Sequence, residues 1–327
     1  MKSSSVTIVM YHYVRDLRQT AYPRIQGLDV SFFRQQLGYF KKYYDFVTMQ
    51  DVLKCLRGEG GMRQDSILLT FDDGYKDHFE FVFPILDELG LQGSFFPSGK
   101  AIQEQIVLDV NKIHFIIEVM KEPRAIIRDI RALMDLHREQ YRLFSFESYY
   151  KTLAKADHLD TAEIVFIKLL LQKVLPERLR KSIVDELFTK YVSDDEVEFS
   201  RELYMSVDQL KYLSKHGMYI GSHGWNHVWL DTLLEKQQEN EVVLALQFLQ
   251  NIGADVNEWV MCYPYGAQNS SLRSLLQRYG CRLGLTTESA IANLTIQDPF
   301  VLPRFDTNDF PKDENAKPNT GTLQVLT

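Results

Sequence analysis

Cysteine is scarce in this sequence of 327 residues, which contains only Cys55, Cys262 and Cys281. Three residues are an odd number, and they lack the regular spacing of a disulfide framework. We therefore expect reduced thiols and a fold that depends on its hydrophobic core. The hydrophobic content of 45% and the aromatic content of 12% are sufficient for such a core.

The sequence also lacks an excess of basic residues. Lys and Arg number 37 against 44 Asp and Glu, which gives a formal net charge of −7. Proteins that bind a phosphate backbone normally carry a basic surface, so we expect no nucleic-acid partner. A neutral or weakly cationic substrate is easier to accommodate, although the local potential in a cleft can oppose the net charge.

Long apolar runs are missing as well. No window approaches the roughly 18 apolar residues of a membrane span, and the N-terminal run from Val6 to Tyr11 is too short for the core of a signal peptide. We therefore predict a cytoplasmic protein with no membrane span, on the assumption that no leader has been trimmed from the sequence.

Short β-type runs alternate with helical stretches over most of the chain, which is the pattern of βα units around a parallel sheet. The predicted strands cover residues 6–11, 66–70, 94–96, 218–221, 259–263 and 282–286, with 300–302 as a final one. An α/β barrel commonly occupies about 250 residues as one domain. The chain is longer than that, so we expect one catalytic domain with an insertion.

Helical periodicity with almost no strand signal interrupts this alternation within residues 101–200. Asp160 and Glu163 form a capping-box pattern, and Pro176 predicts a break before a helix over residues 177–191. We interpret the region as a helical insertion. The simpler interpretation is a packed appendage, and the functional one is a lid or a surface for homo-oligomer formation.

The chain accordingly divides into four predicted parts. Residues 1–100 and 201–310 form the two parts of the barrel domain, 101–200 is the insertion, and 311–327 is a C-terminal tail. Proline, glycine and asparagine residues from Asp306 onward predict loose order near this end.

Two adjacent carboxylates, Asp72 and Asp73, follow an apolar strand and precede Gly74. The carboxyl ends of parallel strands are where α/β proteins build their sites. Taken alone, an Asp-Asp-Gly sequence is more often a turn or a helix cap, because aspartate and glycine are common turn residues.

Two histidines, His223 and His227, follow another predicted strand at the i, i+4 spacing of metal ligands. A lone pair with this spacing is more often a surface or core feature. Imidazoles and a carboxylate that meet at strand ends, however, can bind a divalent cation and leave positions open. The second carboxylate is then placed to accept a proton from an attacking water.

These segments resemble the polysaccharide deacetylases with the NodB homology domain, also called carbohydrate esterase family four. Residues 70–74 match the first motif of the family letter for letter, and residues 223–227 match the second in both histidines. Weaker similarities are Met10-Tyr11-His12, Tyr204-Met205-Ser206 and Tyr263-Pro264-Tyr265-Gly266. The resemblance covers nearly the whole chain except the insertion.

The resemblance implies a distorted (β/α) barrel that holds a divalent metal ion, with zinc as the first choice. It also implies removal of an N-acetyl group from an amino sugar in a cell-surface polysaccharide or its biosynthetic precursor. Asp72 falls on the catalytic base of the family, and Asp73, His223 and His227 fall on its metal ligands. Tyr265 falls where the family uses a backbone N–H to stabilise the oxyanion.

Three positions depart from the family pattern. Gly224 replaces the usual Ser or Thr after the first histidine, Cys262 replaces the arginine that orients the base, and no histidine follows His227. Arg304 is our candidate for the missing arginine near Asp72, with a surface ion pair as the alternative.

An amine leaves poorly unless it is protonated, so the late histidine needs a replacement as general acid. His12 is our candidate because it follows the N-terminal strand, and some family members with permuted motifs resemble this arrangement. We expect its ring on the opposite side of the metal from Asp72. The alternative is a buried histidine that is hydrogen-bonded in the core.

Two other functions remain open. The departures at Cys262 and after His227 suit a non-catalytic carbohydrate-binding or scaffold protein derived from a deacetylase, although retention of Asp72 argues against it. Two histidines and a carboxylate also suit a non-haem iron oxygenase. The identity of the sugar, the acyl group and the metal, and the choice between a polymer and a monomeric or nucleotide-linked substrate, stay undetermined.

Overall fold

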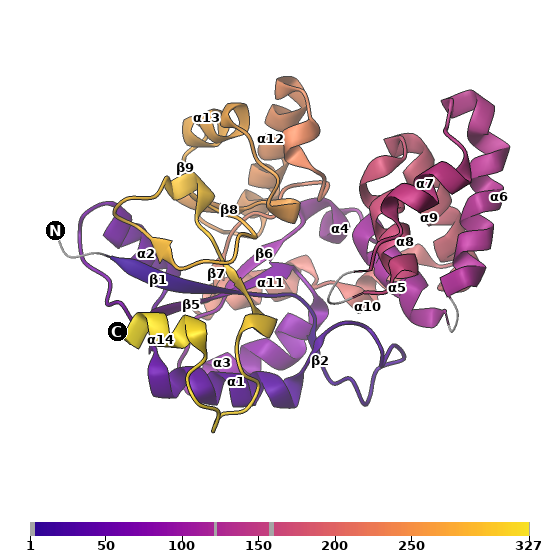
Figure 1. Cartoon of the computed structure of the whole chain (residues 1–327). Coiled ribbons are helices and arrows are strands. Elements are labelled where there is room, and N and C mark those ends of the chain that lie inside the picture. The colour runs from indigo at the N-terminus through magenta and orange to yellow at the C-terminus, as the bar shows by residue number, and fades with distance from the viewer. Residues whose placement is uncertain (1–3, 121–122, 157–159, 327) are drawn as a thin grey trace. The chain divides into compact units, whose positions relative to one another are not determined.

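The computed structural model describes residues 4–120, 123–156 and 160–326, and it divides the chain into two compact units (Figure 1). Unit 1 comprises Met1–Arg18, Gln26–Gln105 and Arg201–Thr327, and unit 2 comprises Gln19–Ile25 and Ile106–Ser200. Among the described residues, no helix combines the length and apolar character needed to cross a membrane.

The centre of unit 1 is a mostly parallel sheet. Its main strands are β1 (Ser5–Tyr11), β5 (Ser66–Asp73), β6 (Ser94–Pro97) and β7 (Tyr219–Ile220), paired in that order. Every residue of β5 is buried, as expected for a parallel strand that is covered on both faces. The short strands at its margins are β4 (Asp45–Phe46), β10 (Ala292–Asn293) and β11 (Phe305–Asp306).

Further pairing extends this sheet beyond β7. A parallel bridge between Ser222 and Met261 leads to β8 (Trp259–Cys262), which pairs with β9 (Cys281–Leu285). Leu285 then bridges to Leu302, and β11 pairs with β1. The series of pairings thus returns to its first strand, which is compatible with the distorted barrel that we predict.

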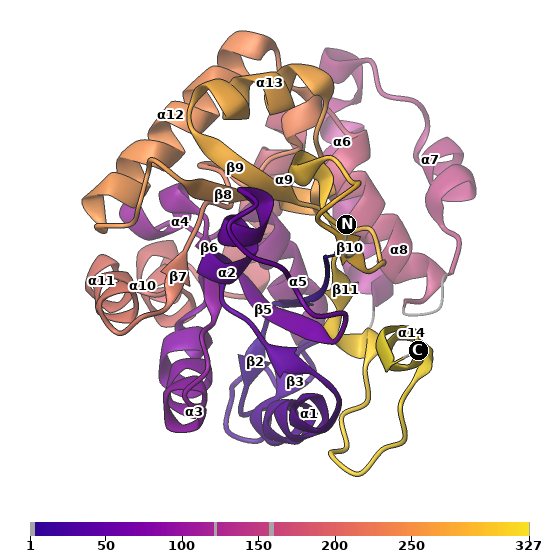
Figure 2. The same cartoon turned by 90° about the vertical axis from the view of Figure 1, so that its left-hand side faces the viewer.

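Helices cover the strands of unit 1 on both sides. In Figures 1 and 2, α12 and α13 lie on the side of β8 and β9, whereas α1 and α3 lie on the opposite side. The helices are α1 (Val30–Tyr43), α2 (Met49–Leu56), α3 (Phe83–Leu89), α4 (Gly99–Gln103), α11 (Val207–Lys215), α12 (Glu235–Asn251), α13 (Ser270–Arg278) and α14 (Thr320–Leu326). A π-helical turn, His78–Val82, precedes α3, and the short strands β2 (Val14–Arg15) and β3 (Leu28–Asp29) pair with each other.

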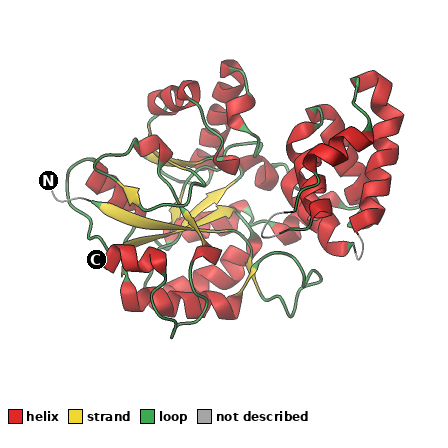
Figure 3. Ribbon diagram, in the orientation of Figure 1, coloured by secondary structure: helices red, strands yellow, loops and turns green. Residues whose placement is uncertain are grey.

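The regular secondary structure of unit 2 consists of helices among its described residues, which loops connect, as the colouring of Figure 3 shows. Its helices are α5 (Asp109–Val119), α6 (Pro123–Tyr141), α7 (Phe146–Leu153), α8 (Ala162–Leu169) and α9 (Glu177–Tyr191), followed by α10 (Glu196–Leu203), which continues into unit 1. Residues 19–25 belong to this unit because the Tyr22 ring packs edge-on against Phe115 and the Arg24 backbone N–H donates to Glu118 Oε1 over 2.8 Å.

Two predicted boundaries in unit 2 have different outcomes. The break at Pro176 is confirmed, because α9 begins at Glu177. The capping box of Asp160 and Glu163 is wrong: α8 begins at Ala162 and lacks a side-chain cap bond. The Asp160 carboxylate instead accepts a hydrogen bond from Lys168 Nζ at 2.5 Å.

The C-terminal region also differs from our expectation. The predicted strand over residues 300–302 is mostly a 3₁₀ turn, Pro299–Val301, in which the proline cannot donate to a ladder. The expectation of loose order beyond Asp306 is wrong, because Thr322 of α14 is buried and its Oγ1 lies 2.8 Å from Tyr39 Oη of α1. Pairing with a distant hydroxyl is not visible in local composition.

Candidate metal centre

The first motif forms the end of β5 and the turn that follows it. Asp73 has a φ of 69° and Gly74 a φ of 75°, so the chain leaves the strand through two residues in the left-handed region. Glycine is required at position 74, because a Cβ there would lie 2.7 Å from Pro97 Cβ. Strained backbone of this kind is concentrated at functional sites.

Asp73 and the two predicted histidines converge on one point. Asp73 Oδ1 lies 3.4 Å from His223 Nε2 and 3.3 Å from His227 Nε2, and all three side chains are buried. Ligand atoms held about 2.0 to 2.1 Å from a tetrahedral zinc ion lie about 3.3 to 3.4 Å from one another. Both distances from Asp73 Oδ1 match this spacing, and the three ligand atoms lie within 4.8 Å of one another, so they could hold one divalent ion.

Neighbouring groups orient these side chains. The carbonyl of Cys262 accepts a hydrogen bond from His223 Nδ1 at 2.8 Å, which leaves Nε2 as the nitrogen that can bind a cation. Tyr75 Oη donates to Asp73 Oδ2 at 2.6 Å. Asp73 Oδ1, however, is buried without a hydrogen-bond partner among the described residues. An orphaned carboxylate oxygen facing two imidazole nitrogens fits a bound cation.

Arg304 holds the carboxylate of Asp72. It is our candidate for the orienting arginine, because Cys262 stands where the family usually has that residue. Arg304 Nη1 lies 2.9 Å from Asp72 Oδ1 and Nη2 lies 2.8 Å from Oδ2, and the guanidinium is fully buried. Arg304 Nε also donates to the Thr286 carbonyl at 2.9 Å. The contact is therefore a buried bidentate pair and not the surface ion pair of our alternative interpretation.

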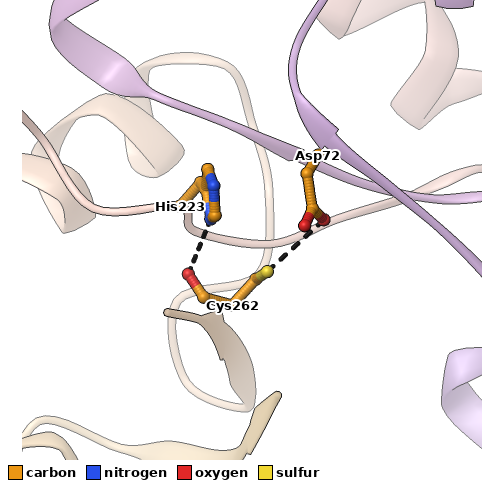
Figure 4. Close-up of side chains that lie close together, drawn as sticks. All are labelled: Asp72, His223 and Cys262. Atoms are coloured by element: carbon orange, nitrogen blue, oxygen red, sulfur yellow. Dashed lines mark hydrogen bonds between the residues drawn. The ribbon is translucent and has the colours of Figure 1, made fainter. Parts of the chain in front are cut away.

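The thiol of Cys262 occupies the space beside this pair. Figure 4 shows its Sγ next to Asp72 Oδ1, at 3.3 Å, while its carbonyl oxygen contacts His223. Burial raises the pKa of the Cys262 thiol, so the group is neutral and donates its proton to the carboxylate. Cys262 thus links the base candidate Asp72 to the ligand candidate His223.

Electrostatics keep both carboxylates ionised. Burial would raise the pKa of Asp72, but the Arg304 charge and its hydrogen bonds lower it to about 2. Burial likewise opposes ionisation of Asp73, but its contacts with His223 and His227 hold the pKa of that carboxyl well below its usual range. An ionised Asp73 is the form that binds a cation.

His12 lies beside Asp72, and its placement corrects two expectations. Its Nε2 is 4.0 Å from Asp72 Oδ2, and its side chain is 41% exposed. The buried core histidine of our alternative interpretation is therefore wrong. The expectation that the metal-binding group separates His12 from Asp72 is also wrong, because the acid and base candidates are direct neighbours.

Tyr265 borders the same centre through the loop after β8. Its backbone is in the left-handed region, with a φ of 58°, and its ring centroid lies 4.9 Å from that of His227. Trp229 stacks on Tyr265 with a centroid distance of 4.5 Å and an interplanar angle of 3°. An aromatic pair therefore flanks the two candidate ligand histidines.

Glu241 of α12 is a site residue that the sequence prediction missed. Its Oε2 accepts the backbone N–H groups of Trp225 at 3.2 Å and Asn226 at 2.9 Å, and its Oε1 accepts from the Asn226 side chain. This carboxylate supports the loop that Gly224 leaves without a hydroxyl. The available signal was a charged residue on the buried face of α12, between Gln238 and Ala245.

Comparison with known proteins finds one family of sequences that this chain resembles. The sequence model of the family described as polysaccharide deacetylase matches residues 59–135 and 187–284. The Bacillus subtilis (strain 168) protein YxkH, provisionally described as a polysaccharide deacetylase, is 27% identical over 90 residues. That match covers 28% of this chain and 32% of YxkH, so it spans about a third of the relative.

Solved structures with the same fold cover nearly the whole chain. The Streptococcus pyogenes deacetylase PplD in complex with acetate is 15% identical, with a TM-score of 0.56 and coverage of 99% of this chain and 98% of PplD. IcaB from Ammonifex degensii is 16% identical, with a TM-score of 0.57 and coverage of 99% and 98%. At these identities the likeness is one of α/β fold.

Proposed function

Because the chain belongs to the polysaccharide deacetylase family, we propose that it removes an N-acetyl group from an amino sugar in a cell-surface polysaccharide or its biosynthetic precursor. The observation that carries the proposal is the convergence of Asp73, His223 and His227 with the ionised Asp72 beside them. The acetate in the related PplD structure is also the product that such a reaction releases.

Asp73, His223 and His227 would hold a divalent ion, with zinc as the first choice because one carboxylate and two imidazoles suit it. When bound, this ion supplies a Lewis acid that acidifies water and polarises the acetamide carbonyl. Tyr75 and the Cys262 carbonyl keep the ligand atoms aimed at one point. Outer contacts of this kind typically change metal affinity by about 10- to 100-fold.

Asp72 acts as the general base that accepts a proton from the attacking water. Both of its oxygens accept from Arg304, and Oδ1 also accepts from Cys262, so Oδ2 retains the free lone pair. The low pKa of about 2 keeps Asp72 ionised but makes it a weak base. It therefore needs a water that is already acidified, which agrees with a metal-dependent reaction.

Tyr265 and His12 complete the proposed reaction. The Tyr265 backbone N–H stabilises the oxyanion, a contact that is typically worth about 3 to 4 kcal/mol when it is preorganised. His12, when protonated, donates to the departing nitrogen so that a neutral amine leaves. Its position beside Asp72 puts the proton donor and the proton acceptor at the same side of the site.

Two features weigh against the rival functions. An oxygenase needs the metal ligands but has no use for the buried Arg304–Asp72 pair, and oxygen consumption would distinguish it. A non-catalytic scaffold would not need to keep Asp72 ionised in a buried site, since that carboxylate costs desolvation energy. We keep the cytoplasmic location as a prediction, and it favours a biosynthetic precursor over an assembled polymer.

The test is metal content measured together with acetate release from a panel of N-acetylated sugars. The parent protein should contain one divalent ion per chain and release acetate. Asp72→Asn should keep the ion and lose about 10²- to 10⁴-fold in turnover, because an amide cannot accept the proton. Turnover of Asp72→Asn at the parental rate would refute the role of the base, and absence of acetate from every sugar would refute the function.

A further inference from the structure

The segment after the first motif contacts the segment that carries His12. The Tyr75 ring stacks on Tyr13 at a centroid distance of 4.1 Å. Asp77 Oδ2 accepts from Arg15 Nε at 2.7 Å. Together with His78, these residues contact the segment of residues 12–15 at three points.

His78 makes the contact that involves His12 directly. Its Nε2 lies 2.6 Å from the carbonyl oxygen of His12, and the side chain is completely buried. A carbonyl can only accept a hydrogen bond, so Nε2 must carry the proton. Burial lowers the pKa of His78 to about 4, which keeps the ring neutral and its tautomer fixed by this bond.

The surroundings of His78 suit a rigid donor and leave no route for a substrate to reach it. The rings of Phe71, Tyr75 and Phe95 pack around it at centroid distances of 5.5, 5.6 and 5.9 Å. His12 itself is different, because its side chain is 41% exposed and packing covers it only in part. The place of its ring near Asp72 therefore depends on where its backbone is held.

We propose that His78 is a positioning residue for the general acid: its bond to the His12 carbonyl fixes the backbone from which the His12 ring reaches the leaving nitrogen. The inference deepens the proposed function and rests on it. Asp73 is the last residue of β5, and His78 follows it by five residues at the start of the π-helical turn. One short segment would therefore position both a metal ligand and the proton donor.

The experiment compares His78→Leu, His78→Gln and a matched control, His216→Leu. His216 also bonds a backbone carbonyl through its ring, from Nδ1 to Tyr212 at 2.8 Å, but on the exposed face of α11. Each variant is assayed as the metal-loaded protein on an N-acetylated amino sugar and on an activated aryl acetate. The ester needs no protonation of its leaving group, so it reports the rest of the site.

His78→Leu should lower kcat for the amide about 10- to 100-fold while KM and ester turnover stay within about twofold. His78→Gln, which keeps a donor, should recover amide turnover to within about threefold of the parent. His216→Leu should match the parent. Equal loss on amide and ester, or no recovery with glutamine, would overturn the proposal and assign His78 to the core.

Two further measurements test directly whether His78 acts through His12. In the His12→Gln background, His78→Leu should cause no additional loss of amide turnover, and an additive loss would overturn the proposal. The NMR signals of the His12 ring should shift in His78→Leu but not in His216→Leu, and unchanged signals would also overturn it. This readout needs no activity, so failure of the positioning role is distinguishable from failure of the deacetylase function.

Discussion

Arg304 in unit 1 and Lys112 in unit 2 are both cations with almost no exposed surface, yet they are paired in different ways. Arg304 meets Asp72, whose side chain is 1% exposed. Lys112 Nζ meets Asp185 at 2.6 Å and Glu196 at 2.9 Å, and these carboxylates are 40% and 37% exposed. One pair is buried at both ends, and the other reaches water through its anions.

The difference separates the ion pair at the proposed site from an ion pair in the helical unit. Desolvation of both partners costs several kcal/mol per ion and is repaid only when every donor is satisfied. Each guanidinium nitrogen of Arg304 donates a hydrogen bond, and the acceptors are Asp72, Thr70 and the Thr286 carbonyl. Lys112 needs no such arrangement because water solvates its anions, and its Nζ lies 5.5 Å from the centroid of the Phe188 ring. The costlier pair is the one at the proposed site.

Arg304→Met should have the largest effect on the free energy of unfolding among the variants of the two ion pairs. It should destabilise the protein by about 3 to 5 kcal/mol, because Asp72 is left buried and uncompensated. Urea unfolding measures the loss. Adding Asp72→Asn removes the stranded charge, so the double variant should regain about half of the loss or more. A double variant as unstable as Arg304→Met would contradict the electrostatic explanation.

His78 extends the comparison to a buried titratable side chain that is neutral in the folded protein at neutral pH. Its pKa of about 4 when folded lies below the ordinary value of about 6.5. Below pH 6.5 the unfolded chain binds a proton that the folded chain does not, so stability falls by about 1.4 kcal/mol per pH unit, or about 2 kcal/mol at pH 5. In His78→Leu this part of the acid slope should disappear, and identical slopes in both proteins would count against it.

Glu241 tests whether a buried anion can be held by N–H donors in place of a cation. Glu241→Gln replaces one acceptor oxygen with a donor and so loosens the loop before His227. Metal affinity should fall about 10- to 100-fold, measured by calorimetry, while the fold remains. Glu235→Gln, at the exposed start of the same helix, serves as the control and should bind like the parent. Equal affinities in all three proteins would limit Glu241 to packing.

Lys112→Met should have the smallest effect. Its carboxylates are already partly exposed, and methionine keeps the apolar stem, so the free energy of unfolding should change by about 1 kcal/mol or less. Comparison with Arg304→Met under the same denaturant conditions checks the contrast directly. A loss as large as that of Arg304→Met would mean that exposure of the anions does not decide the cost.

Local patterns predicted the elements that deliver the site. Strands β5 and β8 lie within a few residues of the predicted ranges 66–70 and 259–263, because each depends on neighbours a few residues away. The resemblance supplied the candidates Asp73, His223 and His227, and the structure brings them together. Their roles stay predictions until a metal is measured.

Contacts between distant residues were harder to predict. The sequence indicated Arg304 as a candidate. Only the structure shows the bidentate contact of its guanidinium with Asp72, which lies 232 positions away in the chain. It also reversed the expected placement of His12 and revealed Glu241 as the support of the histidine loop. No periodicity records such pairings, because they depend on which strand and helix ends meet when the sheet closes.

By itself the sequence determined the α/β class, most of the longer strands along the chain and the side chains available for metal and proton chemistry, because these follow from hydrophobic period and residue type. Only the tertiary structure decided which of those groups are buried, charged and paired. Burial keeps the Cys262 thiol and the His78 ring neutral, whereas the charge of Arg304 keeps Asp72 ionised in spite of its burial. The physical reason is that desolvation and partner charge act over a few ångströms in space, whatever the separation along the chain.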